Sequence, residues 1–284
     1  MRKLLNTLYV TTPEAYLSKD GLNVVISVKQ VETFRIPIIN IEQIVTFGYM
    51  GASPGLMKLC AENNVSLTFL SPNGRFIGHF QGPIKGNVLL RKRQYELSSQ
   101  TDYALHLSQL FIAGKIRNYR SILRRAIRDN GPNENLDAIA NLLEQRRKQV
   151  LEAQDFNVLR GLETVGLDPY VGFLHTLKPG RYSLALDIME EFRAYLGDRL
   201  VLSLINKSQI RPHDFIIQGE DGITMTENGR KILLTAWQTR KKEEIIHPYL
   251  NEKVPIGLLP YVQSLLLARM IRGDLSDYPV FLIK

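Results

Sequence analysis

The hydrophobic periodicity of the chain changes near Arg91, and this change constrains the fold more than any other feature. Before it, short runs rich in β-branched and aromatic residues are separated by turn residues, as is typical of strands. After it, apolar residues recur at the spacing of amphipathic helices. The chain of 284 residues is long enough for two domains. We therefore predict an α+β protein, with a small N-terminal β-rich domain (residues 1–85) followed by a larger all-α domain (residues 86–284).

Turn and helix signals divide the predicted β-rich domain into short elements. Ser53-Pro54 starts a brief helix, with serine as its cap and proline at the first helical position. Asn73-Gly74 is typical of a hairpin turn. Pro37 indicates an edge strand or an interrupted one, because proline donates no backbone hydrogen bond. The predicted strands are 22–28, 34–39, 43–47, 65–70 and 75–80.

The rest of the chain has the pattern of several helices. The first is predicted over about 95–128, with a mild break at Gly114. The second begins near Asn135, and Gly219–Gly222 is predicted to be a turn between two short strands. Further helices are expected at 183–196, 226–246 and 258–272. The second helix presents an apolar face made of Leu136, Ile139, Leu142, Leu143 and Val150.

Composition narrows the class of partner and of chemistry. Lys and Arg outnumber Asp and Glu by 36 to 28, which gives a net charge of +8 and favours a polyanionic partner. The one cysteine, Cys60, is expected to pack in the core, and its lack of an intrachain partner fits a reducing cytoplasm. No apolar run approaches the ~20 residues of a membrane span, and no signal peptide is indicated. Phosphate-binding P-loop, dinucleotide-binding and zinc-binding cysteine motifs are all absent from the sequence.

Four arginines fall on nearly one face of the first predicted long helix. They are Arg117, Arg120, Arg124 and Arg128, and none has a carboxylate four residues further on. Arginine can grip phosphate oxygens with two parallel hydrogen bonds, so this face is a candidate for contact with a DNA backbone. A solvated charged face is the alternative. Weaker basic clusters lie at 91–93, 146–148 and 240–242.

A histidine and two carboxylates form the candidate site. His175 ends the run Gly166-Leu-Asp-Pro-Tyr-Val-Gly-Phe-Leu-His175, and Asp187 and Glu190 lie three residues apart on a predicted helix, hence on one face. An imidazole with oxygen ligands is suited to a divalent cation. Two alternatives remain at this point, a core histidine and an ion pair of Glu190 or Asp187 with Arg193.

Several stretches, taken in order, resemble one family. Besides the run that ends at His175 they include Ser183-Leu-Ala-Leu-Asp187-Ile-Met-Glu190 and Ala268-Arg-Met-Ile-Arg-Gly-Asp274. The others are 4–10, 51–55, 73–76 and 159–161. Together they resemble the CRISPR-associated integrase, the first of the Cas proteins ("Cas one"), and most closely its subtype I-C branch. The resemblance spans nearly the whole chain.

This resemblance implies an N-terminal β domain that forms a homodimer and a helical catalytic domain. It implies double-stranded DNA as substrate (spacer ends and the CRISPR repeat), and assembly with a dimer of a second small Cas protein ("Cas two"). It further implies Mg²⁺ or Mn²⁺ held by His175, Glu190 and a glutamate. His175, Asp187 and Glu190 are the catalytic residues it implies, with Asp187 holding a second cation or orienting the ligands.

The glutamate of that metal site is the point at which this chain departs from the family. Leu159-Arg-Gly161 is followed by Glu163, as in the family pattern, but several dozen residues that the family has before the His175 segment are absent. We therefore assign Glu163 no metal role. Either the chain carries a deletion at Gly161–Leu162, or a segment is missing from the sequence. We expect the second, because losing a ligand and a core helix should cripple fold and chemistry.

The function expected from these features is metal-dependent integration of DNA by transesterification, in which a DNA 3′-hydroxyl attacks a phosphodiester of the repeat. A structure-specific nuclease acting on branched DNA is one alternative. A non-catalytic DNA-binding scaffold, in which Asp187, Glu190 and Arg193 form an internal salt-bridge network, is another.

Overall fold

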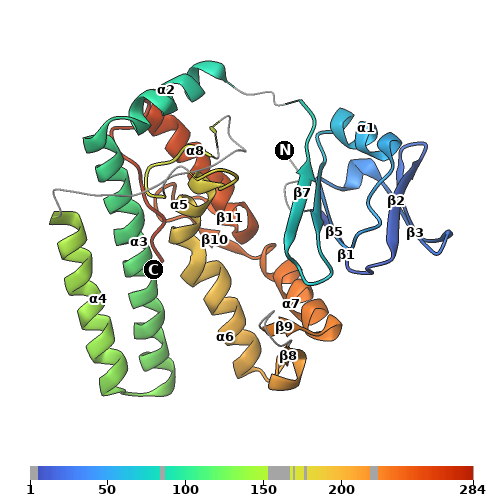
Figure 1. Cartoon of the computed structure of the whole chain (residues 1–284). Coiled ribbons are helices and arrows are strands. Elements are labelled where there is room, and N and C mark those ends of the chain that lie inside the picture. The colour runs from blue at the N-terminus through green and yellow to red at the C-terminus, as the bar shows by residue number, and fades with distance from the viewer. Residues whose placement is uncertain are drawn as a thin grey trace. The chain divides into compact units, whose positions relative to one another are not determined.

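The computed structural model describes residues 6–83, 87–152, 167–168, 170–175, 178–217 and 223–283 (Figure 1). The chain divides into two compact units. The first unit contains Met1–Ile84 and Lys207–Lys242, and the second contains Lys85–Asn206 and Glu243–Lys284. Residues 207–242, which the sequence pattern alone groups with the helical part, are therefore grouped with the strands. The N-terminal region is rich in strands and the C-terminal region is mainly helical, as the change in periodicity predicts.

Two β-sheets dominate the first unit. In one, β1, β5 and β6 are parallel to one another, and β7 is antiparallel to β6. In the other, β2, β3 and β4 form an antiparallel meander. Pro37 is the last residue of β4, an edge strand, as predicted. The strands are β1 Thr7–Val10, β2 Ala15–Asp20, β3 Asn23–Val28, β4 Val31–Pro37, β5 Gln43–Phe47, β6 Ser66–Leu70 and β7 Phe76–Phe80.

Helix α1 (Pro54–Glu62) begins where the sequence predicts. The hydroxyl of Ser53 accepts a hydrogen bond from the backbone N–H of Leu56 over 3.2 Å, and Pro54 needs no such partner. The helix buries Leu56 and Cys60, and burial raises the pKa of the Cys60 thiol to about 12. Cys60 is thus a packed, protonated thiol, as expected.

The predicted helix over 226–246 is shorter in the structure. Helix α7 (Glu227–Arg240) is capped by Thr226, and the chain then forms β10 (Glu244–Ile246) of the second unit. Strand β10 pairs with β11 (Lys253–Pro255), and this pairing with a later segment is what ends the helical pattern. The two short strands predicted around 219–222 are β8 (Phe215–Ile217) and β9 (Ile223–Met225).

The second unit is built on helices, and the predicted helix over 95–128 is in fact two. Helix α2 ends at Ser98 and α3 begins at Thr101, so the break lies at 99–100 and not at Gly114. Gly114 lies inside α3, where an added Cβ would come within 2.2 Å of Cγ1 of Val280. Close packing therefore explains this glycine. The helices are α2 Val88–Ser98, α3 Thr101–Asn130, α4 Glu134–Glu152, α5 Ser183–Phe192, α6 Arg199–Asn206 and α8 Leu259–Arg272.

Helices α3 and α4 form an antiparallel hairpin, drawn in green in Figure 1. The apolar face predicted for α4 is only partly covered by the described residues. Ala140 is fully buried, whereas Ile139 and Leu142 keep 47% and 48% of their surface exposed. The segment is helical as its spacing predicts, but Ile139 and Leu142 lie outside the face that α4 turns toward α3.

The core of the second unit fixes helix α5. Leu184 and Ile188 of α5 pack with Phe111 of α3, Phe173 of the preceding loop and Leu267 of α8. A π-helical segment, Arg193–Asp198, joins α5 to α6; such wider turns often occur at functional sites. Because α5 is anchored on its apolar side, its polar residues are held in fixed positions. No helix of the described part of the chain is long and apolar enough to cross a membrane.

Candidate functional site

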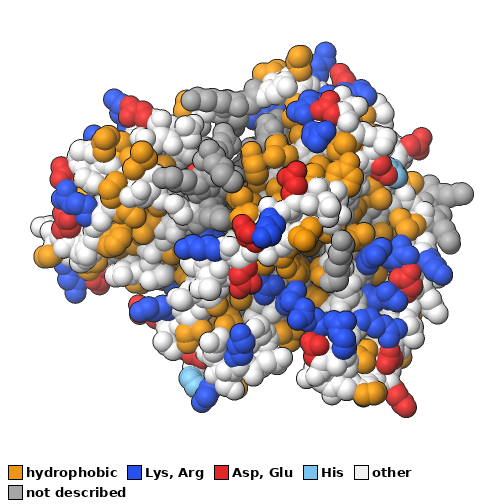
Figure 2. All heavy atoms as spheres, turned by 180° about the vertical axis from the view of Figure 1, so that it is seen from behind, with side chains coloured by type: hydrophobic (Ala, Val, Ile, Leu, Met, Phe, Trp, Pro, Cys, Tyr) orange, Lys and Arg blue, Asp and Glu red, His pale blue; other side chains and the backbone are white. Residues whose placement is uncertain are grey.

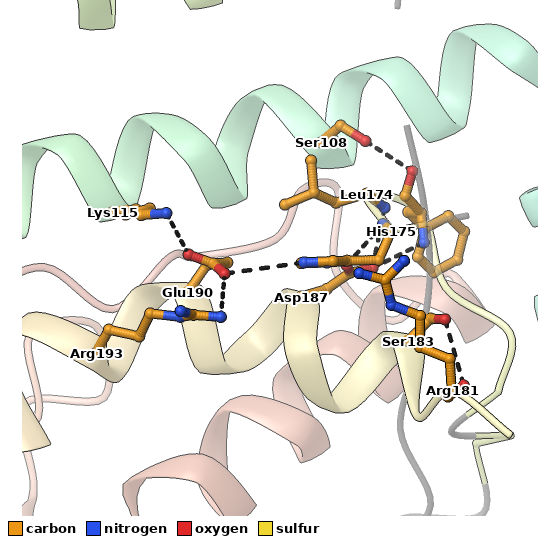
Figure 3. A network of polar contacts seen from close by, with 10 residues as sticks. Ser108, Lys115, Leu174, His175, Arg181, Ser183, Asp187, Glu190 and Arg193 are labelled. Carbon is orange, nitrogen blue, oxygen red and sulfur yellow. Dashed lines mark hydrogen bonds and ion pairs between the residues drawn. The ribbon is translucent and has the colours of Figure 1, made fainter. Parts of the chain in front are cut away.

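His175 and Asp187 meet at the N-terminal half of α5. Nδ1 of His175 lies 2.7 Å from Oδ1 of Asp187, and the side chain of His175 is 17% exposed while that of Asp187 is fully buried (Figure 3). The carboxylate accepts a hydrogen bond from Nδ1–H, and Nε2 is the ring nitrogen that is not bound to Asp187. This is the arrangement in which proteins present histidine to a metal ion.

The carboxylate of Asp187 is fully occupied by the loop that carries His175. Oδ2 accepts hydrogen bonds from the backbone N–H groups of Phe173 and Leu174, at 2.9 and 3.0 Å. Oδ1 accepts from the backbone N–H of His175 at 3.0 Å, in addition to the imidazole. Burial raises the pKa of Asp187, and these donors oppose that rise. Four donors from residues 173–175 therefore surround the two oxygens of Asp187.

The loop is also held from the other side. The hydroxyl of Ser108, on α3, donates to the backbone oxygen of Phe173 over 2.7 Å. The position of His175 is therefore fixed by α3 and by α5 together. The hydrogen bonds of Ser108 and Asp187 to this loop are made with its backbone, so the pattern of side chains in the sequence does not indicate them.

Glu190 lies one helical turn beyond Asp187, with a side chain only 6% exposed. Its Oε1 is 3.9 Å from Nε2 of His175 and 2.8 Å from Nη2 of Arg193. Its Oε2 is 2.7 Å from Nζ of Lys115, which comes from α3 (Figure 3). Of the ion pairs expected as the alternative reading, Arg193 therefore pairs with Glu190, whereas Asp187 pairs with His175. Lys115 is a site residue that sequence reasoning did not identify.

The donors His175 and Glu190 fit a divalent cation. Nε2 of His175 faces an oxygen of the nearly buried Glu190 carboxylate, and imidazole nitrogens and carboxylate oxygens are both ligands of divalent cations. The two cationic side chains beside this carboxylate show that it attracts positive charge. Within the residues that the structure describes, no group of three or more His, Cys, Asp or Glu side chains is arranged to hold a metal ion. These two residues would thus be part of a ligand set.

A second buried polar cluster lies beside the site. Glu191, fully buried, accepts from the backbone N–H of Phe281 at 2.7 Å and from Nε2 of Gln263 at 3.0 Å. Burial raises its pKa to about 8. The hydroxyl of Tyr278 donates to it over 2.5 Å, and Nδ2 of Asn118 donates to its backbone oxygen. This cluster ties α5 to the C-terminal segment; the charge pattern of the sequence gave no sign of it.

The four arginines of α3 differ in their surroundings. Arg124 contacts Asp137 and Asn141 of α4, and Arg120 lies 3.8 Å from Glu144 of the same helix. The carboxylates missing from α3 itself are thus supplied by its neighbour. Arg128 is exposed and lies 3.8 Å from Asp129, and Arg117 is exposed as well. Figure 2 shows Lys and Arg side chains gathered over this hairpin on the face seen there.

The site thus pairs a histidine of a loop with carboxylates of α5, in a mainly helical unit that accompanies a strand-rich one. Two segments, residues 8–164 and 157–239, match the family described as "CRISPR associated protein Cas1". The chain belongs to the Cas1 family.

Relatives and solved structures agree with this membership. The chain is 41% identical to "CRISPR-associated endonuclease Cas1 1" of Chlorobaculum tepidum, over 99% of both chains. It is 39% identical to "CRISPR-associated endonuclease Cas1 2" of Rhodospirillum rubrum, over 98% of both. Its fold is similar to that of a "Casposase bound to integration product", with a TM-score of 0.75, 16% identity, and coverage of 97% of this chain and 93% of the other. The "Cas6-RT-Cas1--Cas2 complex" gives a TM-score of 0.71 at 16% identity, over 99% of this chain and 36% of that one.

The chain is shorter than the relatives with which it aligns. Its alignment with the Chlorobaculum relative runs over 340 positions, so at least 56 of them (340 − 284) have no counterpart in the 284 residues here. The two family matches overlap at 157–164, a range that contains Gly161–Leu162, the point at which we expect the segment to be missing. Gly161, Leu162 and Glu163 lie outside the described residues. The assignment of no metal role to Glu163 therefore stays a prediction.

Proposed function

We propose that this protein is a divalent-metal-dependent DNA endonuclease and integrase of CRISPR adaptation, which inserts short DNA segments into a CRISPR array. The observation that carries the proposal is the orientation of His175. Its Nδ1 is bound to Asp187, and its Nε2 faces Glu190 at 3.9 Å. The names of the relatives, which are CRISPR-associated endonucleases, support the same activity.

In this proposal His175 and Glu190 hold Mg²⁺ or Mn²⁺, and Asp187 keeps the imidazole in the tautomer that can bind it. When bound, such an ion stabilises negative charge on the attacked phosphate and lowers the pKa of the attacking hydroxyl. The 3′-hydroxyl of the incoming DNA forms a new phosphodiester as an existing one breaks, so no nucleotide hydrolysis is required. Arg117 and Arg128, exposed on α3, contact the DNA backbone without reading its sequence.

The proposed partners are double-stranded DNA, a second copy of this chain, and a dimer of the second small Cas protein. The casposase neighbour, which is bound to an integration product, supports DNA as a partner, and the neighbour that contains Cas1 and Cas2 supports the second Cas protein. The second copy of this chain rests on the resemblance alone. We place the protein in the cytoplasm, because its single cysteine fits a reducing compartment, and in the subtype I-C branch, on the resemblance described above.

The test is strand transfer of a DNA duplex with free 3′-hydroxyl ends into a plasmid that carries the repeat. We expect His175→Ala and Glu190→Ala to abolish transfer in Mn²⁺ while leaving the melting temperature close to that of the wild type. Comparing joined with merely cleaved products separates an integrase from a nuclease acting on branched DNA. Transfer near the wild-type rate in both variants would refute the assignment.

A second candidate function is a non-catalytic DNA-binding scaffold. It is favoured by Lys115 and Arg193, which contact both oxygens of Glu190 and make that carboxylate part of an ion-pair network. DNA binding that weakens steeply with salt but is indifferent to divalent metal would support the scaffold. Metal-dependent strand transfer would exclude it.

A further inference from the structure

Two cations of different origin contact the carboxylate of Glu190. Arg193 lies three residues further along the same chain segment and contacts Oε1, whereas Lys115 reaches Oε2 from the separate helix α3 (Figure 3). The contact with Arg193 is local and follows from helical spacing. The contact with Lys115 exists only because α3 and α5 pack together. The two side chains therefore need not have the same role.

Lys115 forms a short ion pair with Glu190, in which Nζ lies 2.7 Å from Oε2. The side chain of Lys115 is 37% exposed, so its ammonium group has open space on its solvent side. Lysine has a flexible stem and a compact charge, and such a group can leave one anion for another without movement of the backbone.

The position of Lys115 conflicts with a cation held by Glu190 and His175. Nζ lies at Oε2, whereas Nε2 of His175 and Nη2 of Arg193 both face Oε1. A divalent ion at this carboxylate would lie within a few ångströms of the ammonium, where like charges repel strongly because the surroundings are partly buried. Lys115 and the metal thus compete for Glu190.

We propose that Lys115 is the displaceable counter-ion of Glu190. Without metal, its ammonium neutralises the buried carboxylate and keeps it in position. When metal binds, the ammonium is released toward solvent, where it binds the phosphate group of DNA that approaches the same site. This inference rests on the proposed function, because it assumes that His175 and Glu190 hold a divalent ion.

The test is Mn²⁺ affinity, measured by calorimetry on the full chain without DNA, for the wild type, Lys115→Met and Lys115→Arg. Removal of the competing charge should lower the Kd for Mn²⁺ about tenfold in Lys115→Met, whereas Lys115→Arg, which keeps the charge, should stay near the wild type. Arg125→Met removes one exposed positive charge from the same helix and should leave the Kd for Mn²⁺ unchanged. Melting temperatures confirm that each variant is folded, and Lys115→Gln replaces Lys115→Met if the latter is not.

Strand transfer provides the second readout. At saturating Mn²⁺, Lys115→Met should transfer DNA about tenfold or more slowly than the wild type, since a cation aimed at the phosphate is lost. Tighter metal binding together with slower transfer is the signature of this role; a merely structural lysine would weaken both. If the wild type binds Mn²⁺ and Lys115→Met binds it equally or less tightly, the inference is wrong and the proposed function stands. If neither protein binds Mn²⁺, both fail.

Discussion

Nδ1 of His175 and Oδ1 of Asp187 lie 2.7 Å apart, and this contact decides which nitrogen of the imidazole is available for chemistry. The same carboxylate accepts the backbone N–H groups of residues 173–175, so that one buried side chain fixes the tautomer of the histidine and the loop that carries it. Asp187 is therefore the carboxylate bound to Nδ1 and to the loop, whereas Glu190 is the carboxylate turned toward Nε2; we propose a positioning role for Asp187.

Asp187→Asn should keep the shape of the site, but His175 should no longer be held in its orientation. An amide offers one acceptor oxygen in place of two, so either the imidazole or part of the loop loses its partner. We expect Mn²⁺ affinity and strand transfer to fall about 10–100-fold, the range typical for residues that orient metal ligands. Asp129→Asn, at an exposed carboxylate of α3, is the matched control and should change neither quantity. Equal losses in both variants would contradict the assigned role.

The arginines of α3 should separate into two groups. Arg117→Ala should weaken DNA binding uniformly across sequences and lower the slope of log K against log salt by about one, because one phosphate contact is lost. Arg124→Ala should also lower the melting temperature, since Arg124 links α3 to Asp137 and Asn141 of α4. Lys58→Ala, an equal change of charge on α1, serves as the control. An unchanged salt slope in Arg117→Ala would remove this face from the DNA contact.

Gly114→Ala should destabilise the protein by about 1–3 kcal/mol, because the new Cβ would lie 2.2 Å from Cγ1 of Val280 and the packed core has little room to adjust. Gly197→Ala is the contrasting variant, since its Cβ would meet no atom within 4 Å. Replacing a helical glycine without a clash should stabilise by about 0.4–1 kcal/mol. Chemical denaturation measures both. Equal effects of the two changes would show that Val280 does not pack against α3.

Stability should fall below neutral pH partly through His247, which is 1% exposed. Its Nε2 lies 3.1 Å from Oε1 of Gln263, and its Nδ1 accepts from the backbone N–H groups of Tyr249 and Leu250. Burial lowers the pKa of His247 below 6.5, and the hydrogen bond to Gln263 opposes this only in part. Protonation of Nδ1 would also place its new hydrogen against the backbone N–H groups of Tyr249 and Leu250, which donate to that nitrogen.

The sign of the pH effect follows from that lowered pKa. Below pH 6.5 the unfolded chain takes up a proton that the folded protein does not, so the free energy of unfolding decreases as pH falls from 6.5 toward the folded pKa. His247→Asn keeps an acceptor for the two backbone groups and has no such proton. Urea denaturation between pH 5 and 8 should show a flatter profile in this variant. Parallel profiles would show that His247 titrates equally in both states.

Local sequence signals predicted many elements of this fold, but not the strands β1, β2, β10 and β11 or the division between α2 and α3. The cap at Ser53, the Asn73-Gly74 turn, the edge position of Pro37 and the start of α8 follow from side chains and neighbours close in the chain. The spacing of Asp187 and Glu190 also places both on one face of α5. Such features are local, because helix caps and turns depend on hydrogen bonds over a few residues.

The tertiary structure decided which of these residues meet. The sequence leaves open whether His175 binds Asp187 or Glu190. The packing of its loop between α3 and α5 places its Nδ1 against Asp187. Packing between helices places Lys115 beside Glu190, and it places Asp137 and Glu144 of α4 beside the arginines of α3. The spacing of residues within one helix does not reveal such contacts. By itself the sequence determined the ligand types and the periodicity of the elements. Their pairing required the fold, because burial of the apolar faces sets which polar groups are left within reach of one another.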